Sequence, residues 1–318
     1  MSNYITANRI QTDTDYLFQK GIDTGTYVGF NALGKYYNVK RGSTTYIAGI
    51  PSHGKSEFMF ELLMSLSTHY GWKHALFTPE TGSPVEIVAE LAHKHIGRPF
   101  VKNEYQMSIQ EKYRADAWIS EYFYLLTPND SDLNIDGILK IALEIKREQG
   151  LDTLCIDPFN ELNHDYTKFA GREDKYLENT LGKIRRFARE NDIHVFIVAH
   201  PKTLQMEKGI YLPPTAFQFS GGAAWYAKAE SILCVYRPDM TSNVVEIHVQ
   251  KSKPKHTGQK GIARLYWDWK LSRYYEVLGD GTSQYTTLNR ITQPKANFGA
   301  IEPNNNFYES TKDEDQPF

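Results

Sequence analysis

Short apolar runs and longer amphipathic segments follow one another along most of the chain. A short apolar run bounded by turn-forming residues is typical of a buried strand, and apolar residues spaced three or four positions apart are typical of a helix. The apolar runs predict strands over residues 45–48, 74–78, 122–126, 151–156 and 194–199. The amphipathic segments predict helices over residues 57–70, 84–95, 135–149 and 175–191. This alternation indicates an α/β fold with a mainly parallel sheet flanked by helices.

The pattern changes from Ser231 onward, where apolar runs are separated by short turns and no helical spacing lies between them. These runs predict strands over residues 232–236, 244–249, 263–267 and 274–278. Strands joined by short turns pair antiparallel, so we expect these four to extend one edge of the sheet.

The two ends of the chain differ from this central pattern. We expect an arm over residues 1–20, a single α/β domain over residues 21–290 and a disordered acidic tail over residues 291–318. An apolar cluster at residues 16–18 is either a short helix that docks on a neighbouring subunit or a frayed end with local contacts. The tail ends in an acidic run and a terminal Phe318, which suits either a docking tip for a partner or a merely solubilising segment.

Composition restricts the class of protein further. The chain has 318 residues, of which 41% are hydrophobic, so it can bury a sizeable core. Its net charge of -2 gives no overall attraction for nucleic acid, so any such surface must be local. Cys155 and Cys234 fall in apolar runs and are expected to be buried free thiols of a reducing compartment. We find no signal peptide and no membrane-spanning run, which favours a cytoplasmic protein.

One stretch carries a specific chemical signal. Residues 49–56 fit the pattern G-x-x-x-x-G-K-S/T between a predicted strand and a predicted helix, which is the context of a phosphate-binding loop. Its glycines let backbone N–H groups turn toward phosphate oxygens, and the helix N-terminus favours negative charge. Lys55 supplies a positive charge and Ser56 a hydroxyl for Mg²⁺, so we expect ATP and Mg²⁺ as ligands. The loop residues expected to contact the nucleotide are Gly49, Pro51, Ser52, His53, Gly54, Lys55 and Ser56.

A polar residue follows the carboxyl end of each of three other predicted strands. Asp157 follows residues 151–156 and is a candidate for organising the metal ion. Glu80 could accept a proton from an attacking water, or be a solvated turn residue. His200 could bind the γ-phosphate, or be structural. Residues 251–260 carry four lysines, which form either a solvated turn or a source of positive charge for a phosphate on another subunit.

Together these stretches resemble the DnaB-type replicative helicases of superfamily 4, and most closely their Twinkle-like branch. The resemblance covers roughly residues 15–280. The matching stretches are residues 29–33, 49–58, 78–80, 156–162, 198–201, 213–215, 220–223 and 235–237.

The resemblance implies a RecA-like core that assembles into a ring, usually a hexamer, with ATP between subunits and single-stranded DNA in the pore. It implies that Glu80 is the catalytic base, Asp157 the metal-organising acid and His200 the γ-phosphate sensor. It places Arg237 and Tyr266 where related helicases sandwich the nucleotide base. Pore loops are expected after Asp157 and after His200. In the second of these, Lys202 and Lys208 are the candidates for touching the DNA backbone.

Two departures from the family pattern matter. Only about twenty residues precede the core, so we expect no primase activity in this chain. The K-x-R pattern of the family's trans-acting finger reads Lys251-Ser-Lys253, which replaces an arginine by a lysine. Lys253 is the finger candidate, with Lys251 and Lys255 as competitors.

The sequence therefore predicts a 5′-to-3′ DNA helicase motor encoded by a bacterium or a phage, the polarity being implied by the resemblance alone. Two other functions stay open. One is a RecA/RadA-like recombination ATPase, which shares the fold. The other is an ATP-gated regulatory module, although such a module need not keep a base like Glu80.

Overall fold

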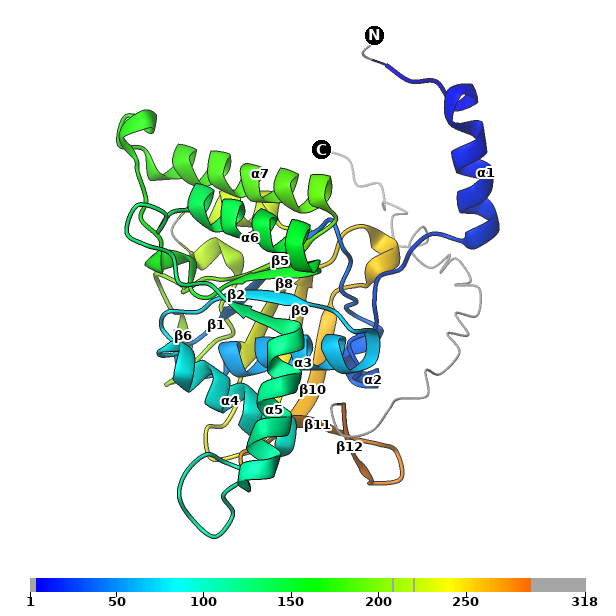
Figure 1. Cartoon of the computed structure of the whole chain (residues 1–318). Coiled ribbons are helices and arrows are strands. Elements are labelled where there is room, and N and C mark those ends of the chain that lie inside the picture. The colour runs from blue at the N-terminus through cyan, green and yellow to red at the C-terminus, as the bar shows by residue number, and fades with distance from the viewer. Residues whose placement is uncertain (1–3, 208, 220, 287–318) are drawn as a thin grey trace, which may run out of the picture.

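A computed structural model describes residues 4–207, 209–219 and 221–286 of the chain (Figure 1). Lys208 and the tail over residues 291–318 lie outside these residues, so the predictions made for them stay predictions. The described chain forms a ten-stranded sheet in the order β12-β11-β10-β9-β8-β1-β5-β4-β2-β3, with helices on both faces. The predicted α/β fold is confirmed.

Six adjacent strands of the sheet are parallel to one another. The order β8-β1-β5-β4-β2-β3 runs in one direction throughout, so all these strands have their carboxyl ends at the same edge. This edge collects the polar residues that follow each strand. The parallel strands are β1 (Thr44–Gly49), β2 (His74–Phe77), β3 (Phe123–Leu125), β4 (Thr153–Ile156), β5 (His194–Val198) and β8 (Ser231–Tyr236).

The remaining strands of the sheet pair antiparallel, as expected. The antiparallel part starts at β9, one strand later in the sequence than predicted. The run over residues 232–236 was expected to be an antiparallel edge strand, and instead β8 pairs parallel with β1. The chain crosses the sheet after β5, through α8 (Gly222–Lys228), and therefore re-enters in the direction of β1. The antiparallel strands are β9 (Val244–Lys251), β10 (Gly261–Asp268), β11 (Arg273–Val277) and β12 (Ser283–Tyr285).

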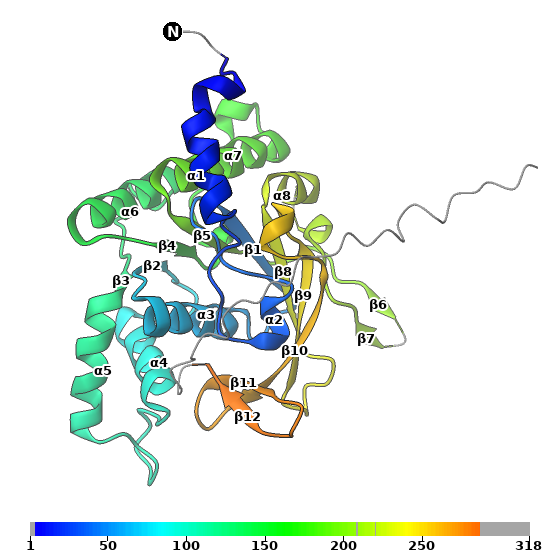
Figure 2. The same ribbon diagram turned by 90° about the vertical axis from the view of Figure 1, so that its right-hand side faces the viewer.

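Two hydrophobic clusters hold the helices against the faces of the sheet. Side chains alternate between faces along a strand, so Ile47 joins one cluster while Tyr46 and Ala48 join the other. The first cluster contains residues of α2 (Asn31–Gly34), α3 (Lys55–Tyr70), α4 (Pro84–Ile96) and α5 (Ile109–Tyr122). The second contains residues of α6 (Ile135–Gln149), α7 (Glu173–Asn191) and α8. Figure 2 shows the sheet between these two helical layers. Cys155 and Cys234 are buried and free, as predicted.

Several elements were missed in the sequence. Helix α5 has a capping box in which the Ser108 side chain and Glu111 satisfy each other's backbone N–H groups, and this S-x-x-E signal is visible in the sequence. Helix α8 is only seven residues long and begins in a glycine pair, so its spacing carries little signal. The segment between β5 and α8 includes a small hairpin of β6 (Met206–Glu207) and β7 (Ile210–Tyr211).

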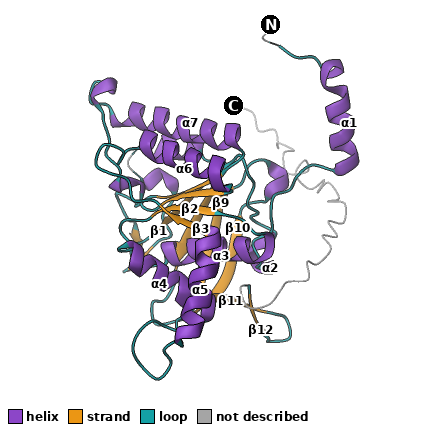
Figure 3. Cartoon of the chain, viewed as in Figure 1, coloured by secondary structure: helices purple, strands orange, loops and turns teal. Residues whose placement is uncertain are grey.

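The N-terminal segment has two parts with different surroundings. Residues 21–42 pack into the first cluster, and Glu276 on β11 accepts hydrogen bonds from the backbone N–H groups of Asn31 and Ala32 at the start of α2. Helix α1 (Gln11–Lys20) has no buried residue and stands apart from the helical layers (Figures 1 and 3). Phe18 is 90% exposed there. None of the helices in the described part of the chain is both long and apolar enough to cross a membrane.

Candidate nucleotide site at the carboxyl edge of the sheet

The phosphate loop connects β1 to α3 and has the backbone shape that its glycines permit. Gly54 has a φ of +86°, a left-handed conformation that disfavours any residue with a Cβ atom. A Cβ atom on Gly49 would lie 2.6 Å from the carbonyl oxygen of Val235. Ser52 also has a positive φ, of 66°. Helix α3 begins directly after the loop at Lys55, so the positive end of its dipole lies at the phosphate loop.

Lys55 and Asp157 are both buried at this edge and attract each other. Burial lowers the pKa of Lys55, while Asp157 and Glu80 oppose that shift. Burial likewise raises the pKa of Asp157, against the effects of Ser56 and Lys55. Each group is thus drawn toward its neutral form by desolvation, which a phosphate or a cation in the site would reverse.

The residues beside the loop fit a magnesium ion. The Oδ2 atom of Asp157 and the Oγ1 atom of Thr78 are buried without a hydrogen-bond partner. Such orphaned oxygen atoms are suited to Mg²⁺ or its water ligands. Within the described residues, no group of three or more His, Cys, Asp or Glu side chains could hold a metal ion by itself. Ser56 and Asp157 are therefore the residues that would hold Mg²⁺ here, beside the phosphates of a nucleotide.

The structure brings Glu80 and His200 into direct contact. The Nε2 atom of His200 lies 3.1 Å from the Oε2 atom of Glu80, although they follow different strands. Glu80 is 57% exposed and His200 is 28% exposed. A carboxylate that can reach solvent beside the phosphate loop has the placement that a general base requires.

His53 is tied to the end of β8 rather than open to solvent. Its Nδ1 atom accepts a hydrogen bond of 2.9 Å from the backbone N–H of Arg237, which puts the proton of the neutral ring on Nε2. Burial, with Lys55 and Arg237 adding to it, lowers the pKa of His53 to about 4. The ring also packs on Tyr236, with centroids 5.5 Å apart. This contact joins the phosphate loop to the neighbouring strand.

The two residues predicted to sandwich the base lie at the same edge of the sheet, at β8 and β10, which are separated by β9. Arg237 follows β8, and Tyr266 pairs with Val244 at the start of β9. The Arg237 guanidinium donates to the carbonyl oxygens of Met240 and Ser242, at 3.0 and 2.7 Å. The Tyr266 ring stacks on Tyr275, with centroids 5.3 Å apart. Each side chain thus has partners of its own, and their role toward a base stays a prediction.

The basic turn after β9 separates the finger candidates. Lys251 is 5% exposed, and its ammonium donates to the carbonyl of Tyr226 and lies over the Tyr226 ring. Burial, with Lys253 adding to it, lowers the pKa of Lys251. Lys253 and Lys255 are exposed. Only these two could therefore reach another subunit without breaking buried contacts.

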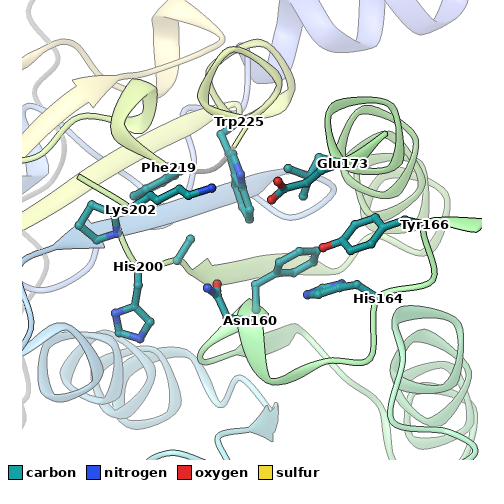
Figure 4. Close-up of a pocket in the computed structure, with 12 residues that line it drawn as sticks. Asn160, His164, Tyr166, Glu173, His200, Lys202, Phe219 and Trp225 are labelled. Atoms are coloured by element: carbon teal, nitrogen blue, oxygen red, sulfur yellow. The ribbon is translucent and has the colours of Figure 1, made fainter. Parts of the chain in front are cut away.

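Sequence reasoning missed two features of the site. The Tyr274 hydroxyl on β11 donates to the carbonyl of Gly54 at 3.3 Å, so a strand of the antiparallel part of the sheet contacts the phosphate loop. A cavity of about 330 Å³ lies between the segments that follow β4 and β5, with His200 and Lys202 on its lining (Figure 4). Lys202 is exposed, and its backbone N–H donates to Gln218 at the far end of the predicted pore loop. No motif signals the cavity, because its residues come from four separate segments.

A phosphate loop after the central strand of a parallel sheet, with a buried aspartate after a nearby strand, defines the RecA-like class of P-loop NTPase cores. Two solved structures share this fold. One is an ATPase domain, which matches with a TM-score of 0.69 and 18% identity, over 86% of this chain and 99% of that one. The other is a DnaB-like replicative helicase, solved to show its interactions with primase, which matches with a TM-score of 0.68 and 18% identity, over 86% of this chain and 67% of that one.

A sequence relative points to one branch of this class. The chain is 33% identical over 274 residues, or 83% of its length, to the Twinkle homolog protein, chloroplastic/mitochondrial, of Arabidopsis thaliana. It spans 38% of that relative's length. The predicted resemblance to the DnaB-type helicases and their Twinkle-like branch is thereby confirmed. No protein-family model matches the chain. The relative's name refers to plant organelles, so it gives no support to the bacterial or phage origin that we expected.

Proposed function

We propose that the chain is the motor of a ring-forming DNA helicase. It hydrolyses ATP between subunits, moves along single-stranded DNA and unwinds duplex DNA during replication. The observation that carries the proposal is the meeting of the phosphate loop, Asp157 and the Glu80–His200 pair at one edge of a RecA-like sheet. A pure ATP sensor would need the loop but no exposed carboxylate beside it.

The side chains have distinct roles in the proposed hydrolysis. Lys55 and the N-terminus of α3 bind the phosphates, and Glu80 accepts a proton from the water that attacks the γ-phosphorus in line with the leaving diphosphate. His200 orients the Glu80 carboxylate through their 3.1 Å contact and senses the γ-phosphate. Ser56 and Asp157 would hold Mg²⁺, which supplies charge neutralisation on the phosphate oxygens.

A positive charge from a neighbouring subunit completes the proposed site. Charge on the transferred phosphoryl group is stabilised by an added cation, which is worth about 10³–10⁵-fold in comparable enzymes. Lys253 is exposed on the turn between the antiparallel strands β9 and β10, where a ring neighbour could approach. Lysine lacks the planar fork of arginine, so we expect slower turnover than an arginine would give.

Two further surfaces support assembly on DNA. Helix α1 exposes Tyr16, Leu17 and Phe18, and such an apolar set on a projecting helix suits docking on a second copy. Lys202 lies in the segment after β5, where it would contact the DNA backbone together with Lys208.

The acidic tail would recruit other replication proteins. Deletion of residues 304–318 followed by pull-down would test this role.

The deciding experiment measures ATPase activity with and without oligo-dT, and strand displacement on a forked duplex. We expect DNA-stimulated hydrolysis together with unwinding. Glu80→Gln should bind ATP and lose about 10²–10⁴-fold in hydrolysis, because the amide cannot take a proton. Hydrolysis without unwinding, with filaments in electron micrographs, would favour a recombination ATPase. ATP binding without turnover would favour a regulatory module.

A further inference from the structure

Apart from His200, the residues that line the cavity between the segments after β4 and β5 have no role in the proposed ATPase reaction. Its volume is about 330 Å³, which lies at the small end of the range for ligand pockets. Phe159, Phe219 and Trp225 are each at most 5% exposed and line its inner side. Phe159 and Phe219 both meet Trp225 edge to face, with centroids 5.2 and 5.5 Å apart. These rings hold one another rigidly, so the cavity is formed before any ligand enters.

Two half-buried rings extend this aromatic lining toward solvent. His164 packs on Phe159 with centroids 4.9 Å apart, and Tyr166 stacks on His164 at 6.1 Å. The Tyr176 hydroxyl lies 2.9 Å from Nδ1 of His164 and fixes the orientation of that ring. The entrance to the cavity therefore presents flat aromatic surfaces whose positions are set by packing.

Three polar side chains project toward the same space from different segments. They are Asn160 after β4, Glu173 at the start of α7 and Lys202 after β5 (Figure 4). In the described part of the chain, no hydrogen bond or ion pair joins these side chains to other protein groups. They offer an amide, a carboxylate and an ammonium, which together supply both donors and acceptors.

This combination selects the chemistry of the occupant. The charges of Glu173 and Lys202 offset each other, so the cavity favours a neutral ligand over a free phosphate, which Glu173 would repel. An aliphatic side chain would leave the three polar groups unpaired. A nucleobase is flat, neutral and polar along its edge, and it stacks on aromatic rings.

We propose that this cavity accepts one unstacked nucleobase of single-stranded DNA. This inference rests on the proposed function, because the cavity opens between the two segments that would line the pore. Lys202 would then contact the strand beside the inserted base, with Asn160 and Glu173 at the base edge. Backbone contacts alone would bind DNA without its bases equally well, and this difference provides the test.

The test compares oligo-dT with an abasic oligomer of the same length and charge. Fluorescence anisotropy at fixed salt, with a non-hydrolysable ATP analogue, gives both affinities. We expect wild-type protein to bind oligo-dT about 10-fold more tightly than the abasic strand. Tyr166→Leu and Asn160→Ala should shrink that ratio toward one, whereas the matched controls Tyr113→Leu on α5 and Asn163→Ala outside the cavity should retain it.

The outcomes separate this inference from the proposed function. Equal affinity of the wild type for both strands overturns the base pocket and leaves the helicase proposal standing. An unchanged ratio in both Asn160→Ala and a folded Tyr166→Leu also overturns it. Asn160 is exposed, so its variant keeps the test decisive if Tyr166→Leu does not fold. Failure of the wild type to bind either strand would instead contradict the proposed function.

Discussion

Lys251 at the end of β9 and Lys253 on the turn that follows are two positions apart, yet their surroundings differ. The Lys251 ammonium is enclosed against Tyr226, whereas Lys253 is exposed. A buried ammonium that donates to a carbonyl contributes to stability, and an exposed one can act on another molecule. The same residue type thus has a structural role at one position and is available for catalysis at the other.

This contrast gives a paired prediction. Lys251→Ala should lower the free energy of unfolding by about 1–3 kcal/mol, because it leaves the Tyr226 carbonyl without its donor. Lys253→Ala should leave stability unchanged and lower the DNA-stimulated ATPase rate at least 10-fold. Urea denaturation and steady-state ATPase assays measure the two effects.

A mixing experiment then tests whether Lys253 acts in trans. Rings that combine Lys253→Ala and Glu80→Gln subunits should regain some ATPase activity, because some interfaces pair an intact base with an intact lysine. Normal hydrolysis by Lys253→Ala alone on DNA would show that the trans cation is another group, with Lys255 as the next candidate.

At the scale of elements, a buried ion cluster joins α3, α4 and β11. Lys94 on α4 is 1% exposed and lies 3.1 Å from Glu57 and 3.3 Å from Glu61, both on the helix that follows the phosphate loop. Its ammonium also donates to the carbonyl of Ser272, next to β11. Arg273 on β11 donates to the carbonyls of Lys94 and His95 at the end of α4. The cluster fixes the position of α3, the helix that follows the phosphate loop, relative to α4 and β11.

We therefore expect Lys94→Ala to cost about 3–5 kcal/mol in the free energy of unfolding, because it leaves Glu61 buried without its cation. The double variant Lys94→Met/Glu61→Gln should recover part of that loss. Lys112→Ala is the matched control, since Lys112 pairs with Asp116 within α5, where the two side chains are 36% and 32% exposed, and it should cost about 0.5 kcal/mol or less. Equal effects of the Lys94 and Lys112 variants in urea denaturation would contradict this role.

At the scale of the whole molecule, burial of histidines makes the fold sensitive to acid. Burial lowers the pKa of His74 to about 3 and that of His194 to about 4, from an ordinary value of 6.5. As pH falls below 6.5, the unfolded chain binds protons that the folded chain excludes, so stability is lost. Burial raises the pKa of Glu90 to about 7, which works in the opposite direction and offsets part of the loss.

We expect the free energy of unfolding to fall between pH 7 and pH 5, with each buried histidine contributing about 2 kcal/mol at pH 5. Urea denaturation at several pH values measures this slope. His74→Gln should flatten the pH dependence whatever its effect at pH 7, because glutamine does not titrate. An unchanged slope in that variant would mean that other groups cause the acid sensitivity.

Assembly is also a property of the whole molecule. Because α1 has no buried residue, deleting residues 1–20 should leave the unfolding transition unchanged but prevent ring formation with ATP analogue and oligo-dT. Electron microscopy and light scattering would show the loss of rings. Phe18→Ser is the point variant, and it should weaken assembly without affecting the fold, because Phe18 is 90% exposed. Normal rings from the truncated chain would exclude α1 as a docking element.

The sequence by itself determined the phosphate loop, the α/β class and most strands and helices, because each of these depends on residues that are close together in the chain. Helix α6, for example, has the predicted bounds of residues 135–149, since its apolar spacing and its Asn134 cap are both local signals. The strand ends of a parallel sheet share one edge, so the sequence also predicted which polar residues would gather there.

Contacts between distant segments were decided only by the tertiary structure. The direction of β8 depends on a crossover rather than on its own residues. The contact between His53 and Arg237 joins positions 184 residues apart. The burial of Lys251 beside an exposed Lys253 depends on where Tyr226 packs, and the aromatic cavity depends on four segments meeting. No residue pattern encodes these pairings, because each one arises from how helices and strands pack together.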